Sequence, residues 1–482
     1  MLLDPVRVPT RALILLVILL PASRVFGQSA PASPDRPWHS TREQELQSDA
    51  NNLRTYRFSL DSAKTYTLSE LIDLAEAHNP QTRVAWERAR SQAAALGLAR
   101  SELYPTLVAV ALSQLNRADI LFGTTFWSQT VEALQASMEL NYTVLDFGAR
   151  AGRITAARAE VLAANFGFND THRYVIYQVE QAYYQLLNSS GQEGAARASL
   201  ANAQAVQQAA EDRLKNGLAT LPDVLEARSA TAQAEYELES VLGVEAIAQG
   251  NLATVLGTAP TAVIHVQPLD ELPIPESVSD SVEQIIDRAL TERPDLLQQL
   301  AEIRSAKARV KEARAAFYPT LNVAAAPAGE QLYGSQQTLP WIRTGTFAGG
   351  MTLSLNWTVF DGGARRSNLA RAEANAQAAE AQAQVAHDQI ADQVWTAYSN
   401  LNTAFRQRRA ATALLDAASQ SYAAALESYN YGLRSLLDVT QAQRTLAEAR
   451  STDILARTQV LGALADLAFR TGDSIQGGAR KP

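Results

Sequence analysis

The side chains that most often carry out catalysis or bind metal ions are few and scattered in this sequence. It contains no cysteine, which excludes disulfides, thiolate metal sites and a cysteine nucleophile. No two of the five histidines have the spacing of a metal-binding pair; they are His39, His78, His172, His265 and His387. The sequence also lacks phosphate-binding loops, nucleophile elbows and paired catalytic acids. We therefore expect no enzyme and no metal or cofactor site.

One acidic residue does recur in a matched setting. Residues 216–218 read Asn-Gly-Leu and precede Asp223, whereas residues 431–433 read Tyr-Gly-Leu and precede Asp438. The glycine of each motif can adopt the left-handed conformation with which many helices end. The carboxylate that follows can accept hydrogen bonds from the free N–H groups at the start of the next helix. The two motifs therefore predict two helical hairpins, each with an aspartate where its return helix begins.

This recurrence extends over most of the chain. Residues 104–107 return at 318–321, and eight of the eleven positions of 140–150 are identical in 355–365. The offset stays at 214 or 215 residues, so the chain is a tandem duplication. A period of this length indicates two large units, not a solenoid of short repeats.

Composition and proline placement divide the chain into segments. Residues 1–27 read as a signal peptide, because a short apolar run follows Arg7 and Arg11 and ends in small residues; a short membrane anchor is the alternative. The other predicted segments are an N-terminal extension (28–66, partly disordered), a first repeat (67–257), a Pro-rich connector (258–280), a second repeat (281–472) and a disordered C-terminal tail (473–482). No later stretch is apolar enough to predict a transmembrane helix. The net charge of −8 gives no sign of a nucleic-acid partner.

Each repeat is expected to contain one helix, two strands and two further helices. The first helices should span roughly 68–103 and 282–317, with breaks near Pro80 and Pro294. After the strands, helices of about 66 residues should begin near residues 149 and 364. At 1.5 Å per residue such a helix is roughly 100 Å long and must pack sideways against other long helices.

The strands are predicted from alternating apolar and polar residues. Residues 134–144 and 347–359 alternate with a period of two, so each should be a long strand with one apolar face. That length suits a strand that crosses a membrane at a tilt. The strands after Pro105 and Pro319 look shorter and less regular.

Four strands per chain imply association with further copies. Four strands cannot close a barrel, and an open sheet edge is not tolerated in lipid. Two chains would supply eight strands, whose interior is filled by side chains, so three chains suit a conduit better. We therefore predict a mainly α fold with a β membrane part. Long helical (α-barrel) hairpins and four transmembrane strands per chain would form a 12-stranded β-barrel and a 12-helix α-barrel as a trimer.

The order of elements, the duplication, the Asp-x-Gly-Ala-Arg at the strand ends and the Gly-Leu turns before Asp-Val resemble the TolC-like outer-membrane efflux protein family. The resemblance covers about residues 67–472, and its most specific motifs are 213–228 and 428–443. It implies a homotrimeric channel in the outer membrane, in contact with outer-membrane lipid and with a large periplasmic part. It also implies that a periplasmic adaptor and an inner-membrane pump of RND, ABC or MFS type pass substrate to this channel, in efflux or type I secretion.

The resemblance further implies the functional residues. The adaptor would contact the helix tips, at Gly217, Leu218, Gly432 and Leu433. The channel gate or constriction would contain Asp223, Glu226, Tyr429, Arg434, Asp438 and Gln441.

Within that gate the resemblance gives each hairpin its own part. Asp223 matches an aspartate that bonds the other hairpin, and Tyr429 and Arg434 match its partners. Asp438 matches an acidic ring at the narrowest point of the channel. Three such carboxylates around one axis would attract cations and repel anions.

Three positions depart from the family pattern. Gln441 stands where the best-known member has an acid, and the matching position of the first hairpin is Glu226. The second acidic ring is therefore either missing or displaced onto Glu226. Pro222 replaces a hydroxyl-bearing residue, so one hydrogen bond of the gate is expected to be lost.

The alternative interpretation is a periplasmic coiled-coil scaffold or adaptor without a pore. Such a protein has no need for strands that are apolar on one face, so the alternation at 134–144 and 347–359 favours the channel. A general diffusion porin does not fit, because porins have short periplasmic turns instead of long helices. Drugs, metal ions, siderophores and polypeptides all remain open as cargo.

Overall fold

The computed structural model describes residues 34–35, 39, 42–52, 58, 60–277, 281–336 and 340–472. The chain forms two units, Met1–Phe58 and Ser59–Pro482. In the first unit the structure describes the helix α2 (Glu43–Asn52). The predicted signal peptide, the C-terminal tail and much of the N-terminal extension lie outside the described residues.

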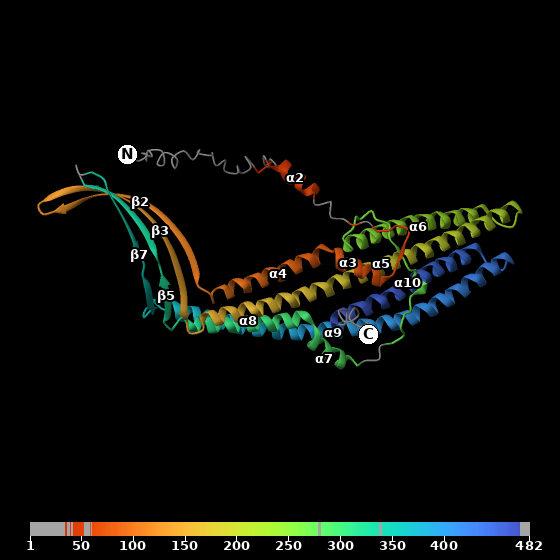
Figure 1. The fold of residues 1–482 in the computed structure, drawn as a ribbon. Coiled ribbons are helices and arrows are strands. Elements are labelled where there is room, and N and C mark those ends of the chain that lie inside the picture. Colours follow the sequence, from red (N-terminus) through yellow and green to blue (C-terminus); the bar gives the residue numbers. More distant parts are fainter. Residues whose placement is uncertain are drawn as a thin grey trace. The chain divides into compact units, whose positions relative to one another are not determined.

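The second unit contains both repeats (Figure 1). The first repeat consists of α3 (Leu68–His78), α4 (Pro80–Ser101), β2 (Thr106–Phe122), β3 (Thr125–Leu145), α5 (Ala149–Lys215) and α6 (Leu221–Val255). The second consists of α7 (Val282–Glu292), α8 (Pro294–Ala315), β5 (Thr320–Ala325), β6 (Ala328–Gln336), β7 (Ile342–Ala348), β8 (Met351–Asn356), α9 (Ala364–Asn430) and α10 (Leu436–Thr471). Between the repeats lie β4 (His265–Val266), which pairs with β1 (Thr65–Tyr66), and the short helix η2 (Leu269–Glu271).

The long helices confirm the prediction to within one residue. α5 and α9 contain 67 residues each, and both begin at a glycine with positive φ, Gly148 (101°) and Gly363 (90°). A residue with a side chain is strained at such angles, so glycine permits the sharp change from strand to helix. α5 packs against α4, α6, α8 and α10, and α9 packs against α8 and α10. In Figure 1 the strands leave one end of these helices, and the hairpin turns lie at the other.

The predicted helix breaks are present in both repeats. Pro80 and Pro294 each begin a new helix, where their missing N–H is not needed. The residue before each proline joins the break to the end of a distant helix. Asn79 Nδ2 donates to the carbonyl oxygen of Val255 at 2.9 Å, and Arg293 Nη1 donates to that of Arg470 at 3.2 Å. Because Val255 and Arg470 occupy equivalent positions, the duplication extends to this contact.

The sheet is antiparallel and has four strand positions, in the order β2, β3, β5 with β6, and β8 with β7. Two strand predictions were wrong. β2 is not short but has 17 residues. The strand expected at 347–359 is interrupted at Gly349 and Gly350 and ends at Asn356.

The interruption has a local cause. Pro327 separates β5 from β6 and has no N–H to donate, so the ladder is broken there. Its backbone comes so close to Gly349 that a Cβ on this glycine would lie 3.3 Å from the Pro327 Cα. Ala326 N donates instead to the carbonyl oxygen of Gly350 at 3.1 Å. The two breaks therefore face each other across the sheet.

The register gives the sheet one apolar and one polar face. Leu107, Leu140, Ala325 and Met351 are neighbours across the four strand positions and share one face. The other face carries the row Thr106, Asn141, Ala324 and Thr352. We call the first face the apolar face; its further members are Ala109, Ala111, Leu134, Ala136, Met138, Tyr142, Val323, Phe347 and Leu353.

The apolar face is exposed over the thickness of a bilayer core. Phe347 is 78% exposed, Met351 76% and Leu353 64%. From Leu134 to Leu145 the strand rises roughly 36 Å, which at a tilt of about 40° spans about 28 Å. The hydrocarbon core of a membrane is about 30 Å thick. No helix in the described ranges is both long and apolar enough to cross a membrane.

Candidate functional site

The hairpin turns at the helix tips have the predicted conformation. The N–H of Leu218 donates to the carbonyl oxygen of Arg213 at 2.8 Å, and the N–H of Gly217 donates to that of Leu214 at 3.0 Å. Gly217 has a φ of 70° and Gly432 a φ of 75°. This pair of bonds satisfies carbonyl groups that the end of the helix would leave free. The second turn repeats the arrangement, so α5 and α9 end in the same hydrogen-bonded glycine turn.

Each turn presents an apolar side chain to solvent. Leu218 is 67% exposed and Leu433 79%. Exposed apolar side chains at the ends of otherwise polar helices favour contact with another protein. The four predicted adaptor residues thus lie together on the two turns.

Both predicted aspartates cap the helices that follow the turns. Asp223 Oδ2 accepts from Thr220 N at 2.8 Å and from Thr220 Oγ1 at 2.7 Å. Asp438 Oδ2 accepts from Ser435 N at 3.1 Å and from Ser435 Oγ at 2.8 Å. These hydrogen bonds hold the pKa of each carboxyl below its usual value, so both are ionised at neutral pH. Within one chain Asp223 therefore bonds its own turn.

The other predicted partners lie in different surroundings. Tyr429 is buried among Val224, Val439 and their neighbours, and its hydroxyl has no hydrogen-bond partner among the described residues. Burial raises the pKa of Tyr429. Arg434 is exposed near Asp438, and its charge helps to lower the pKa of that carboxyl.

The remaining constriction residues lie on the return helices. Glu226 of α6 forms an ion pair with Arg444 of α10, with 3.6 Å between Oε1 and Nη2. Gln441 is exposed on α10, one turn after Asp438. The pair joins the two return helices, a contact that sequence reasoning did not predict.

Arg213 connects the two hairpins and was also missed. Its Nη1 donates to the carbonyl oxygens of Tyr429 at 2.9 Å and Asn430 at 3.3 Å. Its guanidinium lies 4.6 Å from the centre of the Tyr429 ring, within the range of a cation–π contact. Arg213 thus caps the end of α9 from the end of α5. Its position within a matched tip motif was the available signal, but the partner helix could not be read from spacing.

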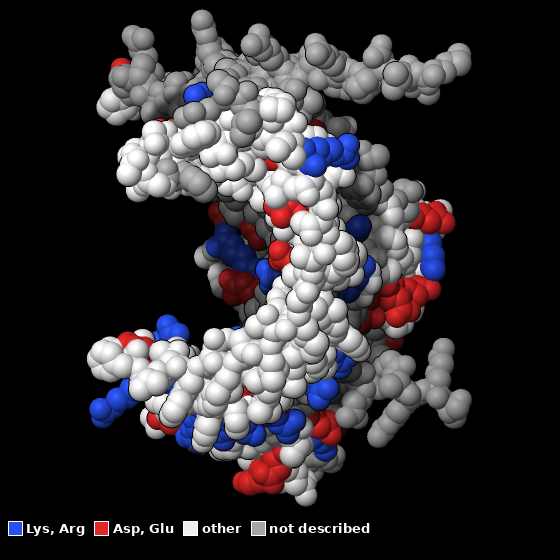
Figure 2. Space-filling view, turned by 60° about the vertical axis from the view of Figure 1, so that its left-hand side comes forward, with Lys and Arg blue, Asp and Glu red and all other residues white. Residues whose placement is uncertain are grey.

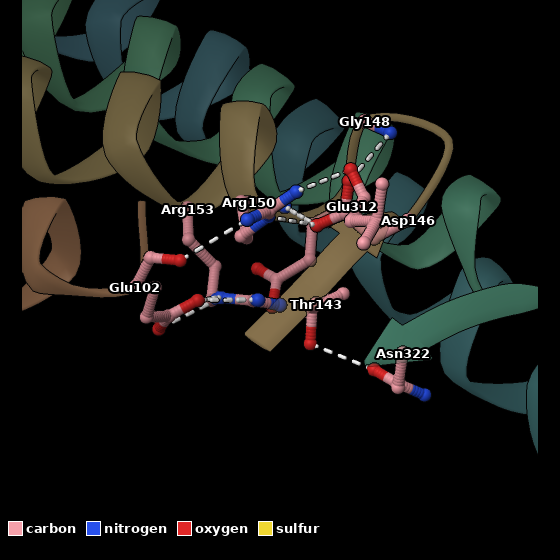
Figure 3. A network of polar contacts seen from close by, with 9 residues as sticks. Glu102, Thr143, Asp146, Gly148, Arg150, Arg153, Glu312 and Asn322 are labelled. Atoms are coloured by element: carbon pink, nitrogen blue, oxygen red, sulfur yellow. Dashed lines mark hydrogen bonds and ion pairs between the residues drawn. The ribbon is translucent and has the colours of Figure 1, made fainter. Parts of the chain in front are cut away.

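The Asp-x-Gly-Ala-Arg motif forms the junction between sheet and helices (Figure 3). Asp146 accepts from the backbone N–H of Gly148 at 3.2 Å and of Arg150 at 2.7 Å, and its Oδ2 lies 3.0 Å from Arg150 Nε. Arg150 also donates to the carbonyl oxygens of Glu102 and Val144. Burial alone would raise the pKa of Asp146, but these hydrogen bonds and the Arg150 charge outweigh it and lower the pKa. The motif recurs with Asp361 and Arg365.

A second arginine spans three helices at this junction. Arg153 of α5 binds Glu102, at the end of α4, and Glu312 of α8, at 2.9 and 3.3 Å (Figure 3). It lines a cavity of about 940 Å³ together with Thr320, Arg309 of α8 and Asn368 of α9. Side chains of four helices and of the polar face of the sheet therefore line one cavity.

Comparison with known proteins agrees with the resemblance seen in the sequence. The family profile described as outer membrane efflux protein matches residues 71–258 and 285–473. Protein CyaE of Bordetella pertussis is 28% identical over 410 residues, which are 84% of either chain. Outer membrane protein OprJ of Pseudomonas aeruginosa is 26% identical over 471 residues, covering 95% of this chain and 94% of the relative.

Solved structures confirm the fold class. The outer membrane protein VceC of Vibrio cholerae superimposes with a TM-score of 0.70 at 20% identity, covering 84% of this chain and 96% of the other. A membrane protein from Pseudomonas aeruginosa gives a TM-score of 0.73 at 24% identity, with coverage of 92% and 98%.

Proposed function

The chain belongs to the outer membrane efflux protein family, and we propose that three copies of it form the outer-membrane conduit of a tripartite efflux or type I secretion system. The observation that carries the proposal is the sheet. Its apolar face is exposed over the thickness of a membrane core, and its polar face looks toward the cavity between the helices. Among the described strands, β2 on one edge and β7 and β8 on the other pair on one side only. Further copies can close these edges into a barrel, as lipid requires.

The proposed partners follow from the helix tips. A periplasmic adaptor contacts Gly217, Leu218, Gly432 and Leu433, where both turns expose a leucine. An inner-membrane pump of RND, ABC or MFS type supplies the substrate. The chain conducts it to the exterior without chemical change.

The proposed gate lies at the same end of the helices. Opening separates the second hairpin from the first, so the contacts of Arg213 with the end of α9 must break. Tyr429 and Arg434 take part in the closed state, and Asp223 of the first hairpin supplies the carboxylate that they contact. Asp438 forms the acidic ring, while the Glu226–Arg444 pair leaves Gln441 as an uncharged position beside it.

Fractionation of cells that express the chain tests the location and the partners. We expect the protein in the outer-membrane fraction, as a trimer on cross-linking, and we expect it to capture an adaptor through the tips. Leu218→Glu with Leu433→Glu should abolish capture but leave the trimer intact. Recovery from the soluble periplasm alone would instead support the scaffold interpretation.

A further inference from the structure

The outward side of the helices is defined by the cavity on their inward side. Arg153 and Glu160 of α5 line the cavity, and Thr320 places the polar face of the sheet on that side. Arg158 of α5 lies on the opposite side of the helix, in a separate groove. On α8 and α9, Arg309 and Asn368 line the cavity. Lys311 and Arg366 are each two residues from them, about 200° around the helix, so both lie on the outward side with Arg158.

Aromatic side chains mark where the apolar face ends. Phe147 and Tyr318 stack with 5.2 Å between ring centres, next to the junction. Trp357 is 60% exposed and Phe360 86%. Exposed aromatic residues at the end of membrane strands are typical of the interface between hydrocarbon and headgroups.

Cations without partners lie directly beyond this aromatic border. Lys311 of α8 and Arg366 of α9 are exposed, and neither has an ion-pair partner in the part of the chain that the structure describes. Lys311 lies four residues before the end of α8, a rise of about 6 Å, and Arg366 lies in the first turn of α9. Their distance from the sheet matches the headgroup layer of a bilayer. In Figure 2 Lys and Arg side chains, with some Asp and Glu among them, lie along the lower border of the largely uncharged surface.

Neighbouring cations on α8 show the contrast. Lys307 lies 2.7 Å from Glu380, and Arg314 lies 2.9 Å from Glu373, so their charges are neutralised within the chain. The charges of Lys311 and Arg366 are left uncompensated. A surface in contact with water alone would not require an excess of positive charge next to the apolar face.

A groove on α5 combines a cation with apolar side chains. It encloses about 300 Å³ and is lined by Leu103, Ile154 and Arg158, among others. Leu103 is 47% exposed, and Arg158 has no ion-pair partner among the described residues. Arg158 lies nine residues into α5, a rise of about 14 Å, and its long side chain leans back toward the sheet, because side chains of a helix tilt toward its N-terminus. An apolar contact and a cation thus lie side by side at the same border.

We propose that Arg158, Lys311 and Arg366 bind the phosphate headgroups of anionic phospholipids in the periplasmic leaflet of the membrane. Leu103 contacts the adjoining glycerol and acyl carbons, while the three cations bind the phosphates. The occupant follows from charge complementarity and from continuity with the lipid-exposed face of the sheet. The inference rests on the proposed function, since it needs the apolar face to lie in a bilayer.

Lipid selectivity of the full-length protein tests the inference. The protein is reconstituted in phosphatidylcholine bilayers, and the association of spin-labelled phosphatidylglycerol is compared with that of spin-labelled phosphatidylcholine. We expect about a fivefold preference for phosphatidylglycerol at each cationic site, which falls as salt is raised from 0.1 to 1 M. Arg158→Gln with Lys311→Gln and Arg366→Gln should remove the preference. Arg83→Gln with Arg406→Gln and Arg409→Gln removes the same charge far from the sheet and should keep it.

The outcomes separate this inference from the proposed function. A triple variant that keeps the wild-type preference overturns the inference. A wild type that inserts and conducts but shows no preference for phosphatidylglycerol also overturns the inference, although the proposed function then stands. Binding of the three cations to isolated cell-wall sacculi instead of phosphatidylglycerol also overturns it. Failure of the wild type to insert into any bilayer defeats the proposed function itself. Because none of the three residues belongs to the gate, an unchanged conductance of the triple variant shows that it has folded.

Discussion

Removal of the Arg213 contacts should open the channel. Arg213→Met keeps most of the apolar length of the side chain but loses the charge and the donors. The carbonyl oxygens of Tyr429 and Asn430, 2.9 and 3.3 Å away in the wild type, then lose their donor, and the Tyr429 ring loses its cation. The end of α9 then keeps only its apolar packing against the first hairpin, around Tyr429 and Val224.

The size of the effect follows from these contacts. A hydrogen bond from a charged donor contributes about 1.5–3 kcal/mol, and an exposed cation–π contact about 0.5–1 kcal/mol. Arg213 is only partly buried and one of its bonds is long, so the low end applies. The tie then stabilises the closed arrangement by about 2 kcal/mol, which corresponds to about a 30-fold shift in the opening equilibrium.

Single-channel recording in planar bilayers measures this shift. Arg213→Met should raise the open probability or the mean conductance, and Arg213→Lys should give a smaller rise, because it keeps the charge but not the paired donors. Lys215→Met is the matched control, since Lys215 pairs at 3.0 Å with Asp212 of its own helix. Equal open probability in Arg213→Met, the control and the wild type would refute the tie.

Three further predictions concern the gate and the junction. Tyr429→Ala with Arg434→Ala should raise single-channel conductance, and an unchanged conductance would remove both residues from the gate. Asp438→Ala should shift the reversal potential toward lower cation selectivity. An unchanged reversal potential in this variant would assign the filter to another group. Asp146→Asn should destabilise the protein by about 2 kcal/mol, because it weakens the charge-assisted hydrogen bonds from Arg150, whereas Asp361→Asn at the more exposed junction should have a smaller effect. The pKa of Asp146 is lowered in the folded state, so this stabilisation is present above the unfolded pKa and is lost as the pH falls through the folded value; melting curves from pH 7 to pH 3 should show wild type and variant converging.

The helical part could be predicted closely because its signals are local. α9 contains neither glycine nor proline, so composition alone determined where it begins and ends. The breaks at Pro80 and Pro294 follow from the missing N–H of proline. The alternation of 134–144 predicted the second half of β3, because one face of the strand is apolar there, but it missed the first half from Thr125.

The strand predictions failed where the bounds of a strand depend on something other than a periodic sequence pattern. β2 continues past Ser113 into residues that mix polar and apolar side chains on both faces, so its outer half gives no alternation. The break at Gly349 depends on its close approach to Pro327 in another strand. Trp357 fits the alternating pattern but leaves the strand, and its Nε1 donates to the carbonyl oxygen of Phe317.

The candidate site shows the same division. The turns and the aspartate caps could be predicted, because they depend on residues within one hairpin. The contact of Arg213 with Tyr429 and the Glu226–Arg444 pair join elements that are about 216 to 218 residues apart in sequence, and no local pattern records which helices meet. We propose that contacts with further copies complete the gate formed by the six predicted residues.

Conductance of the purified wild-type protein tests the central claim most directly. We predict discrete, cation-selective current steps when protein extracted from the outer-membrane fraction is added to a planar bilayer. Protein that inserts into the bilayer but never produces a current step would contradict the conduit.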